Sequence, residues 1–98
     1  MVTFDWDEEK NALLKRTRGV SFEQMVSAIE DGSVADVLEH PNPDRYPGQL
    51  VYLVIHQDYV FVVPSVRDDK SGRVFLKTVY PSRTFTKQYL RQESDDGT

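Results

Sequence analysis

The spacing of apolar residues changes near residue 33 of this chain, and no other feature limits its possible folds as strongly. Before that point, apolar residues recur every three to four positions, which is the spacing of one helix face. After it, they alternate with polar residues or form short continuous runs, as strands do. We therefore predict an α+β fold in which helices precede a sheet.

The first helix is predicted from the signals at its two ends. Residues 2–4 fit a short strand, and Asp5 then has the position of a helix N-cap, with Glu8 three residues later as in a capping box. Gly19 is expected to end this helix, because glycine adopts the left-handed conformation that closes helices at little cost.

A second helix is predicted directly after the first. Ser21 is expected to be its N-cap, and Gln24 completes a second capping box. Gly32 is expected to end it. The two helices together fill the first third of the chain.

Four strands are predicted after the second helix, and consecutive strands are expected to pair antiparallel because the loops between them are too short for crossover helices. A tight turn is expected at Gln57 and Asp58. The strands are placed at residues 34–39, 49–56, 59–66 and 73–80, and a last helix at residues 82–92.

These elements predict one α+β domain, residues 1–92, in which three helices cover one face of a mainly antiparallel sheet of four or five strands. A chain of 98 residues is long enough for one buried core and too short for two. Residues 93–98, ESDDGT, are expected to form a disordered acidic tail.

Several classes of site and location are excluded by what the sequence lacks. There is no cysteine, and the two histidines, His40 and His56, lack the spacing of helical metal ligands, so we expect no metal and no other cofactor. The longest apolar run, residues 50–55, is far shorter than the roughly 20 residues that span a bilayer. The N-terminus carries acids where a signal peptide needs bases, so a cytoplasmic protein without membrane contact is expected.

Charge is distributed unevenly along the chain. Residues 1–44 hold ten acids and four bases, residues 45–92 hold three acids and eight bases, and the tail adds three acids. The segments therefore carry charges of −6, +5 and −3, which sum to the net charge of −4. A cationic second half is consistent with a surface that faces nucleic acid, although solvated charge is the commoner cause of such an asymmetry.

Four motifs in this chain resemble those of one known family. They are FDWDEEKNA at residues 4–12, RGVSFEQM at residues 18–25, an arginine that ends a valine-rich strand, Arg67, and an Arg-x-x-Thr helix start at Arg83 and Thr86. Together they span nearly all of residues 1–92. The set resembles the BrnT-type toxins, which are the ribonuclease partners of type II toxin–antitoxin pairs and have a RelE-like fold.

The resemblance implies an endoribonuclease toxin that cleaves mRNA without a metal ion and so inhibits translation. It implies RNA as the substrate and a cognate antitoxin with a ribbon-helix-helix domain as the partner, with the ribosome as a further candidate. Operator DNA would be reached only through the antitoxin.

Metal-free RNA cleavage needs a base for the 2'-hydroxyl proton, cations for the charge that develops on the phosphate, and an acid for the leaving oxygen. Arg67 and Arg83 are the candidate cations, because a guanidinium group stays charged and binds two phosphate oxygens at once. Lys77 and Tyr80 complete the predicted catalytic set. The residue that abstracts the proton stays open, because lysine and tyrosine ordinarily titrate near about pH 10.

Four further residues are candidates for substrate contacts, and each also has a structural interpretation. Exposed cations are often only solvated, tyrosines often pack between a helix and a sheet, and a histidine at a strand end is often a turn residue. The four are Lys87, Tyr89, Arg45 and His56.

Three departures from the usual family pattern keep a second hypothesis open. The chain has Arg18 where a histidine is usual, Val66 where an acid is usual, and Tyr89 near a usual glutamate. The alternative is a non-catalytic member of the same fold that binds a protein partner or joins a DNA complex.

Overall fold

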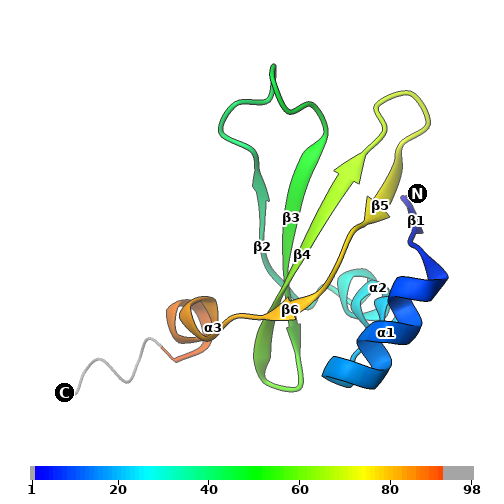
Figure 1. Ribbon diagram of the computed structural model, residues 1–98. Helices are drawn as coiled ribbons and strands as arrows, with labels where there is room; N and C mark the ends of the chain where they lie inside the picture. The colour runs from blue at the N-terminus through cyan, green and yellow to red at the C-terminus, as the bar shows by residue number, and fades with distance from the viewer. Residues whose placement is uncertain (1, 92–98) are drawn as a thin grey trace.

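A twisted sheet of six strands forms the centre of the protein, and helices lie on both of its faces (Figure 1). The structure, a computed structural model, describes residues 2–91. Its elements, in chain order, are β1 (Thr3–Asp5), α1 (Glu8–Arg18), α2 (Phe22–Glu30), β2 (Val34–Glu39), β3 (Gln49–His56), β4 (Tyr59–Arg67), β5 (Arg73–Leu76), β6 (Tyr80–Pro81) and α3 (Arg83–Leu90).

The sheet is an antiparallel meander with one parallel strand added at its edge. Strands β2 to β5 pair antiparallel with their neighbours, as predicted, and β1 pairs parallel with β5. The order is β1-β5-β4-β3-β2, and β6 pairs separately with β4. The α+β class is confirmed, but the sheet is mixed and has six strands rather than four or five.

The additional strand arises because the predicted strand at residues 73–80 is split in two. Pro64 lies in the middle of β4, and its carbonyl accepts a hydrogen bond from the Lys77 backbone N–H at 2.8 Å. Because proline has no N–H, it cannot return a bond to the same neighbour. Pairing with β4 therefore stops after Leu76 and resumes at Tyr80.

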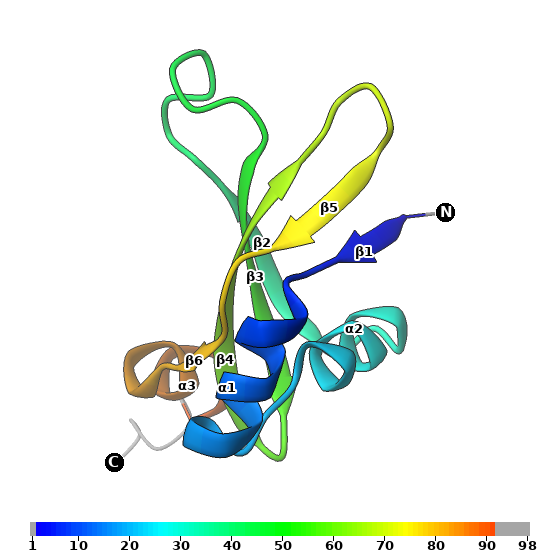
Figure 2. The same ribbon diagram turned by 45° about the vertical axis from the view of Figure 1, so that its right-hand side comes forward.

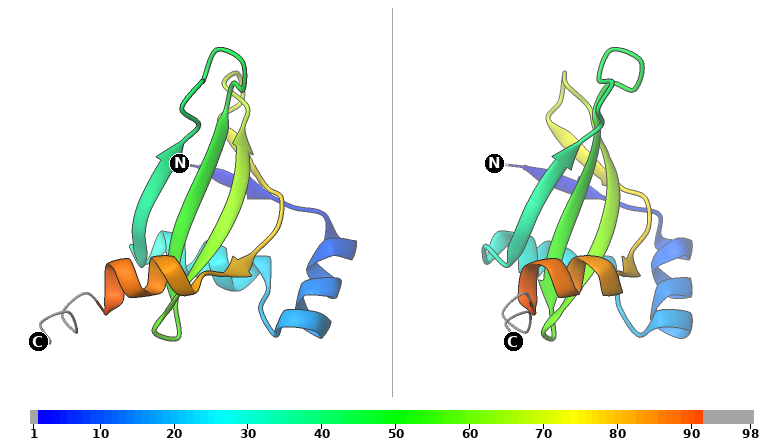
Figure 3. Two further views of the ribbon diagram at one scale, coloured as in Figure 1. Left: turned by 60° about the vertical axis from the view of Figure 1, so that its left-hand side comes forward. Right: turned by 90° about the vertical axis from the view of Figure 1, so that its left-hand side faces the viewer.

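The three helices do not share one face of the sheet, which corrects the prediction that they would. Helices α1 and α2 pack on one face and α3 on the other (Figure 3). Continuous apolar runs in β3 and β4 require this, since alternate side chains point to opposite faces and both sets are apolar. On β4, Val63 lies in the α1–α2 core, while Val60 and Val62 lie in the core under α3.

The N-terminal caps are partly as predicted. The N-cap of α1 is Asp7, whose side chain accepts a hydrogen bond from the Glu9 N–H at 2.9 Å, and not Asp5. Asp5 instead belongs to β1 and forms an ion pair with Arg73 of β5 at 3.2 Å. Gly19 closes α1 in the left-handed conformation, as predicted.

The predicted start of α2 is confirmed in detail. Ser21 caps it, and Gln24 closes the capping box with a hydrogen bond from the Ser21 N–H at 3.0 Å. Asn11 of α1 is buried beside this cap, accepts a hydrogen bond from the Phe22 N–H at 2.8 Å and donates one to Glu23 at 2.8 Å. These bonds join the start of α2 to α1.

Helix α3 begins where the sequence indicates. Ser82 is its N-cap, and the helix ends at Leu90 within the described residues, whereas the predicted end at Gln92 and the predicted tail 93–98 lie outside them. No helix within residues 2–91 is long and apolar enough to cross a membrane.

Candidate functional site

The cations of the second half are concentrated in one segment that contains no acid. Residues 70–91 hold six lysines and arginines and no aspartate or glutamate. This segment forms β5, β6 and α3, so it runs along one side of β4 and then over the face of the sheet opposite α1 and α2 (Figures 1 and 2). The fold therefore keeps these cations along one continuous path.

Three candidate residues lie where β6 turns into α3, and we call them the β6–α3 corner: Tyr80, Arg83 and Lys87. Tyr80 pairs with Val62 of β4, and 41% of its surface is exposed. Arg83 and Lys87 are exposed and four residues apart on α3, which places them on the same side of the helix. Within residues 2–91, the ion pairs leave Arg83 and Lys87 without a carboxylate partner.

The start of α3 adds to the positive potential of this corner. Helix N-termini carry a partial positive charge, and α3 has no acidic side chain in its first turn to neutralise it. The Ser82 side chain accepts a hydrogen bond from the Phe85 N–H at 3.1 Å and so fixes the first turn. An anion bound here would meet a helix end and the Arg83 side chain together.

Arg18 is a cation of this region that the sequence interpretation missed. Its guanidinium donates a hydrogen bond to the carbonyl of Val79 at 2.8 Å. Val79 directly precedes Tyr80, so Arg18 joins α1 to the beginning of β6. The available signal was its position in RGVSFEQM, the motif that resembles the BrnT-type toxins.

Lys77 lies on the approach to the corner. Its backbone bonds to Pro64, whereas the backbone N–H of Ser82 bonds to the carbonyl of Val60 at 2.9 Å. The two attachment points on β4 are four residues apart, or about 13 Å at a rise of about 3.3 Å per residue. Lys77 is exposed and has no ion pair among the described residues.

Arg67 is not brought to the corner. It ends β4, seven residues beyond Val60, so about 23 Å of strand separates it from the start of α3. Its side chain pairs with Asp69, with Nε and Oδ1 3.8 Å apart. The two arginines predicted to share one phosphate therefore lie near opposite ends of β4.

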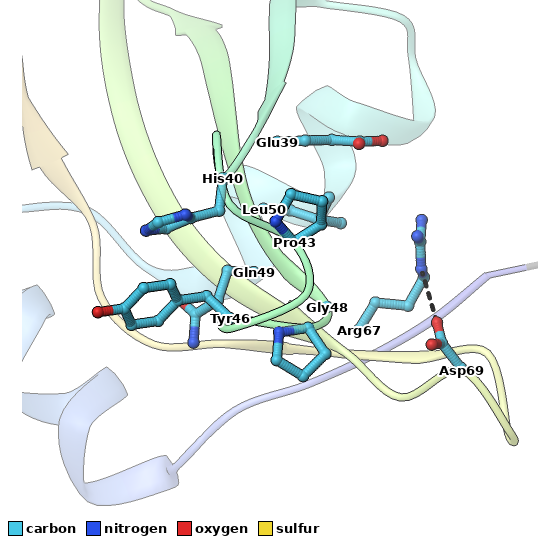
Figure 4. A pocket seen from close by; sticks show the side chains of 10 residues that line it. Glu39, His40, Pro43, Tyr46, Gly48, Gln49, Leu50, Arg67 and Asp69 are labelled. Carbon is cyan, nitrogen blue, oxygen red and sulfur yellow. Dashed lines mark ion pairs between the residues drawn. The ribbon is translucent and has the colours of Figure 1, made fainter.

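Arg67 instead lines a small hollow of about 170 Å³ beneath the loop between β2 and β3 (Figure 4). Arg67 and Asp69 lie at one side of it, and His40 and Tyr46 at the other. The two rings stack with centroids 4.1 Å apart. Arg45, a predicted substrate contact, is on this loop with its guanidinium carbon 6.0 Å from the centre of the Tyr46 ring.

The last two predicted contacts lie away from the corner's exposed surface. His56 ends β3 and meets the edge of Phe61 at 5.7 Å on the α1–α2 face, opposite to α3. The Tyr89 hydroxyl donates a hydrogen bond to Asp36 of β2 at 3.1 Å. Burial, followed by the hydrogen bond and the negative charge of Asp36, raises the pKa of Tyr89.

Within residues 2–91, no three or more histidine, aspartate and glutamate side chains gather as metal ligands would. Comparisons of the sequence with models of protein families and with curated proteins find no match.

Proposed function

We propose that this protein is the toxin of a type II toxin–antitoxin system: a metal-independent endoribonuclease of RelE-like fold that cleaves mRNA and inhibits translation in the cytoplasm. An antitoxin with a ribbon-helix-helix domain neutralises it. The observation that carries this proposal is the β6–α3 corner, in which the exposed Tyr80 and Arg83 flank the N-terminus of α3 and the exposed Lys87 lies one turn further along the helix.

Cleavage would proceed by attack of the 2'-hydroxyl of the RNA on the adjacent phosphate. A base removes the proton of the 2'-hydroxyl, the 2'-oxygen bonds to phosphorus, and the 5'-oxygen leaves with a proton. The products are a 2',3'-cyclic phosphate and a 5'-hydroxyl. Arg83 stabilises the charge that develops on the phosphate oxygens, and Tyr80 or Lys77 transfers a proton.

Lys87 of the corner and two cations outside it, Lys77 and Arg67, would hold the RNA strand on either side of the cleaved bond. Lys87 lies one turn along α3, and Lys77 lies about 13 Å back along β4. Arg67 lies about 23 Å away and pairs with Val74 of the α1–α2 core, so it faces the opposite side of the sheet from α3. It would contact only a distant part of an RNA strand that passes round the edge of the sheet. Its role in this proposal is substrate binding rather than catalysis.

One observation favours a second candidate function. Because Arg67 and Arg83 lie near opposite ends of β4, the phosphate has one arginine from the predicted pair instead of two. A non-catalytic module with the same fold, which binds a protein partner or joins a DNA complex, would also fit this arrangement.

Expression of the protein in a bacterial host separates the two functions. The toxin predicts growth arrest and RNA fragments with 2',3'-cyclic phosphate ends, both lost in Arg83→Ala and insensitive to EDTA in the purified protein. Arg73→Ala is the matched control, because Arg73 lies in the same acid-free segment but pairs with Asp5. Harmless expression of a folded protein, with intact RNA and unchanged binding to a partner protein, would support the non-catalytic module.

A further inference from the structure

A second surface lies on the face of the sheet that carries α1 and α2. Beyond the end of α2, a hollow of about 510 Å³ is lined by Val2, Phe4, Ile29, Glu30 and Tyr52. Figure 2 shows α2 below β1 on this side of the sheet. We call this the β1–α2 hollow.

Two aromatic rings form one wall of the hollow. Phe4 of β1 and Tyr52 of β3 meet edge to face, with centroids 6.0 Å apart, although two strands lie between β1 and β3. Burial raises the pKa of Tyr52, and the nearby Arg67 opposes this shift. The two rings give this wall an aromatic surface, and both residues are only half-buried.

Exposed aliphatic side chains extend this apolar surface. Val37 of β2 pairs with Tyr52 across the sheet, so both side chains point to the same face. Val37 is 43% exposed and Val2 is 49% exposed. Neighbouring exposed apolar side chains beside a hollow are typical of a protein-binding surface.

The charge around the hollow is negative. Residues 19–44, which form α2 and β2, contain six acids and no lysine or arginine. Glu30 lines the hollow, and Glu39 lies two residues beyond Val37 on the same face of β2. Arg67, the cation that acts on Tyr52, is itself paired with Asp69.

We propose that the β1–α2 hollow, together with Val37 and Glu39, binds a basic amphipathic segment of a partner protein. An apolar side chain of that segment enters the hollow, and flanking lysines or arginines pair with Glu30 and Glu39. The volume falls within the roughly 300–1,000 Å³ of ordinary binding pockets, enough for one or two large side chains. Nucleic acid and anionic lipid are disfavoured occupants, because the acidic border repels phosphates.

This inference goes beyond the proposed function, since it uses none of the residues of the β6–α3 corner and concerns the opposite face of the sheet. A second copy of this chain is the other occupant to test, because its acid-free segment is basic. The two possibilities differ in whether the protein associates with itself.

The test is a titration of ¹⁵N-labelled protein with a leucine–lysine amphipathic helical peptide of about 14 residues, or about four turns. A leucine–glutamate peptide of the same pattern is the matched probe. We expect the lysine peptide alone to shift the amide signals of Phe4, Ile29 and Tyr52. Val37→Lys and Glu39→Lys should each weaken binding about tenfold.

Leu13→Lys is the matched protein control, because Leu13 on α1 is 40% exposed and lies outside the hollow. It should leave the affinity within about twofold. Equal binding of both peptides, signal shifts confined to α1 or α3, or equal losses in Leu13→Lys and Val37→Lys would overturn the proposal. So would salt-sensitive self-association abolished by Val37→Lys, which would make a second copy the occupant. RNA cleavage by Val37→Lys tests the proposed function separately.

Discussion

The backbone N–H of Val60 donates a hydrogen bond to the buried hydroxyl of Thr86 at 2.9 Å, and that hydroxyl donates to the carbonyl of Ser82 at 2.7 Å. A single side chain thus ties the start of α3 to the beginning of β4. The position of Arg83, one residue after Ser82, depends on this connection. The Arg-x-x-Thr motif therefore combines an exposed cation with the buried residue that positions its helix.

Replacing Thr86 with valine should lower the free energy of unfolding by about 1–3 kcal/mol, because the buried Val60 N–H would lose its acceptor while the side-chain volume stays the same. Urea denaturation followed by circular dichroism would measure this. Thr86→Ser keeps the hydroxyl and is the control, expected to lose less stability than valine. Equal losses in the two variants would show that the methyl group, and not the hydrogen bond, holds α3.

The second prediction concerns RNA and follows from the separation of Arg67 from Arg83. Arg83→Ala should lower the cleavage rate about 100-fold, as loss of a cation at a developing charge does. Arg67→Ala should change the rate less than about fivefold but weaken binding at low salt. Each lost phosphate contact should reduce the slope of log affinity against log salt by about 0.7 for a single strand.

Single-turnover cleavage and fluorescence anisotropy over a range of salt concentrations would measure these effects. A loss of rate in Arg67→Ala as large as in Arg83→Ala would mean that the two residues act on one phosphate. The backbone separation of about 23 Å would then have to close when RNA binds.

The local signals in the sequence located most of the secondary structure. Strands 34–39 and 49–56 have the predicted limits, and Gln57 and Asp58 form the predicted turn with both residues in the left-handed region. The capping box at Ser21 was also predictable, because it needs only residues close in the sequence. Elements fixed by local hydrogen bonds were therefore the ones identified.

Features set by long-range contacts were not predicted. The N-cap of α1 is Asp7 and not the predicted Asp5, because Asp5 belongs to β1 and forms an ion pair with Arg73. The placement of α3 on the opposite face follows from apolar side chains on both sides of β4. An apolar run indicates a strand that is buried on both faces, but it does not specify which helix covers each face.

The candidate site was predictable only in part for the same reason. The charge of residues 45–92 indicated a cationic second half of the chain, and the corner contains three of the candidates from that half. The contact of Arg18 with Val79 joins residues 61 positions apart, which no local pattern indicates. The separation of Arg67 from Arg83 likewise depends on how β5 and β6 are aligned along β4.

Gly48 provides a third prediction. Its backbone is in the left-handed region, and a Cβ added there would run into the carbonyl oxygen of Arg67. Gly48→Ala should therefore destabilise the protein by more than the roughly 1–2 kcal/mol of left-handed strain alone, since the backbone of β4 must also move. Thermal or urea unfolding would measure the loss.

Gly72→Ala is the matched control for this prediction. Gly72 has nearly the same φ, +77° against +76° for Gly48, but an added Cβ would have no atom within 4 Å. It should show the conformational strain without the clash. If the two variants lose the same stability, the close approach of Gly48 to Arg67 has no energetic consequence.

The contact between Asn11 and Glu23 gives the protein a predictable acid dependence. The hydrogen bond from Asn11 is the largest cause that lowers the pKa of Glu23 from its ordinary value of 4.5. A carboxyl group whose pKa is lower in the folded state contributes stability above its unfolded pKa and loses that contribution as the pH falls through the folded value.

Glu23→Gln has no charge to titrate, yet its amide oxygen can still accept the bond from Asn11. The wild type should therefore exceed this variant in free energy of unfolding by more at about pH 7 than at about pH 3, as measured by urea denaturation at both values. The same difference at both pH values would mean that the ionised form of Glu23 does not stabilise the junction of α1 and α2.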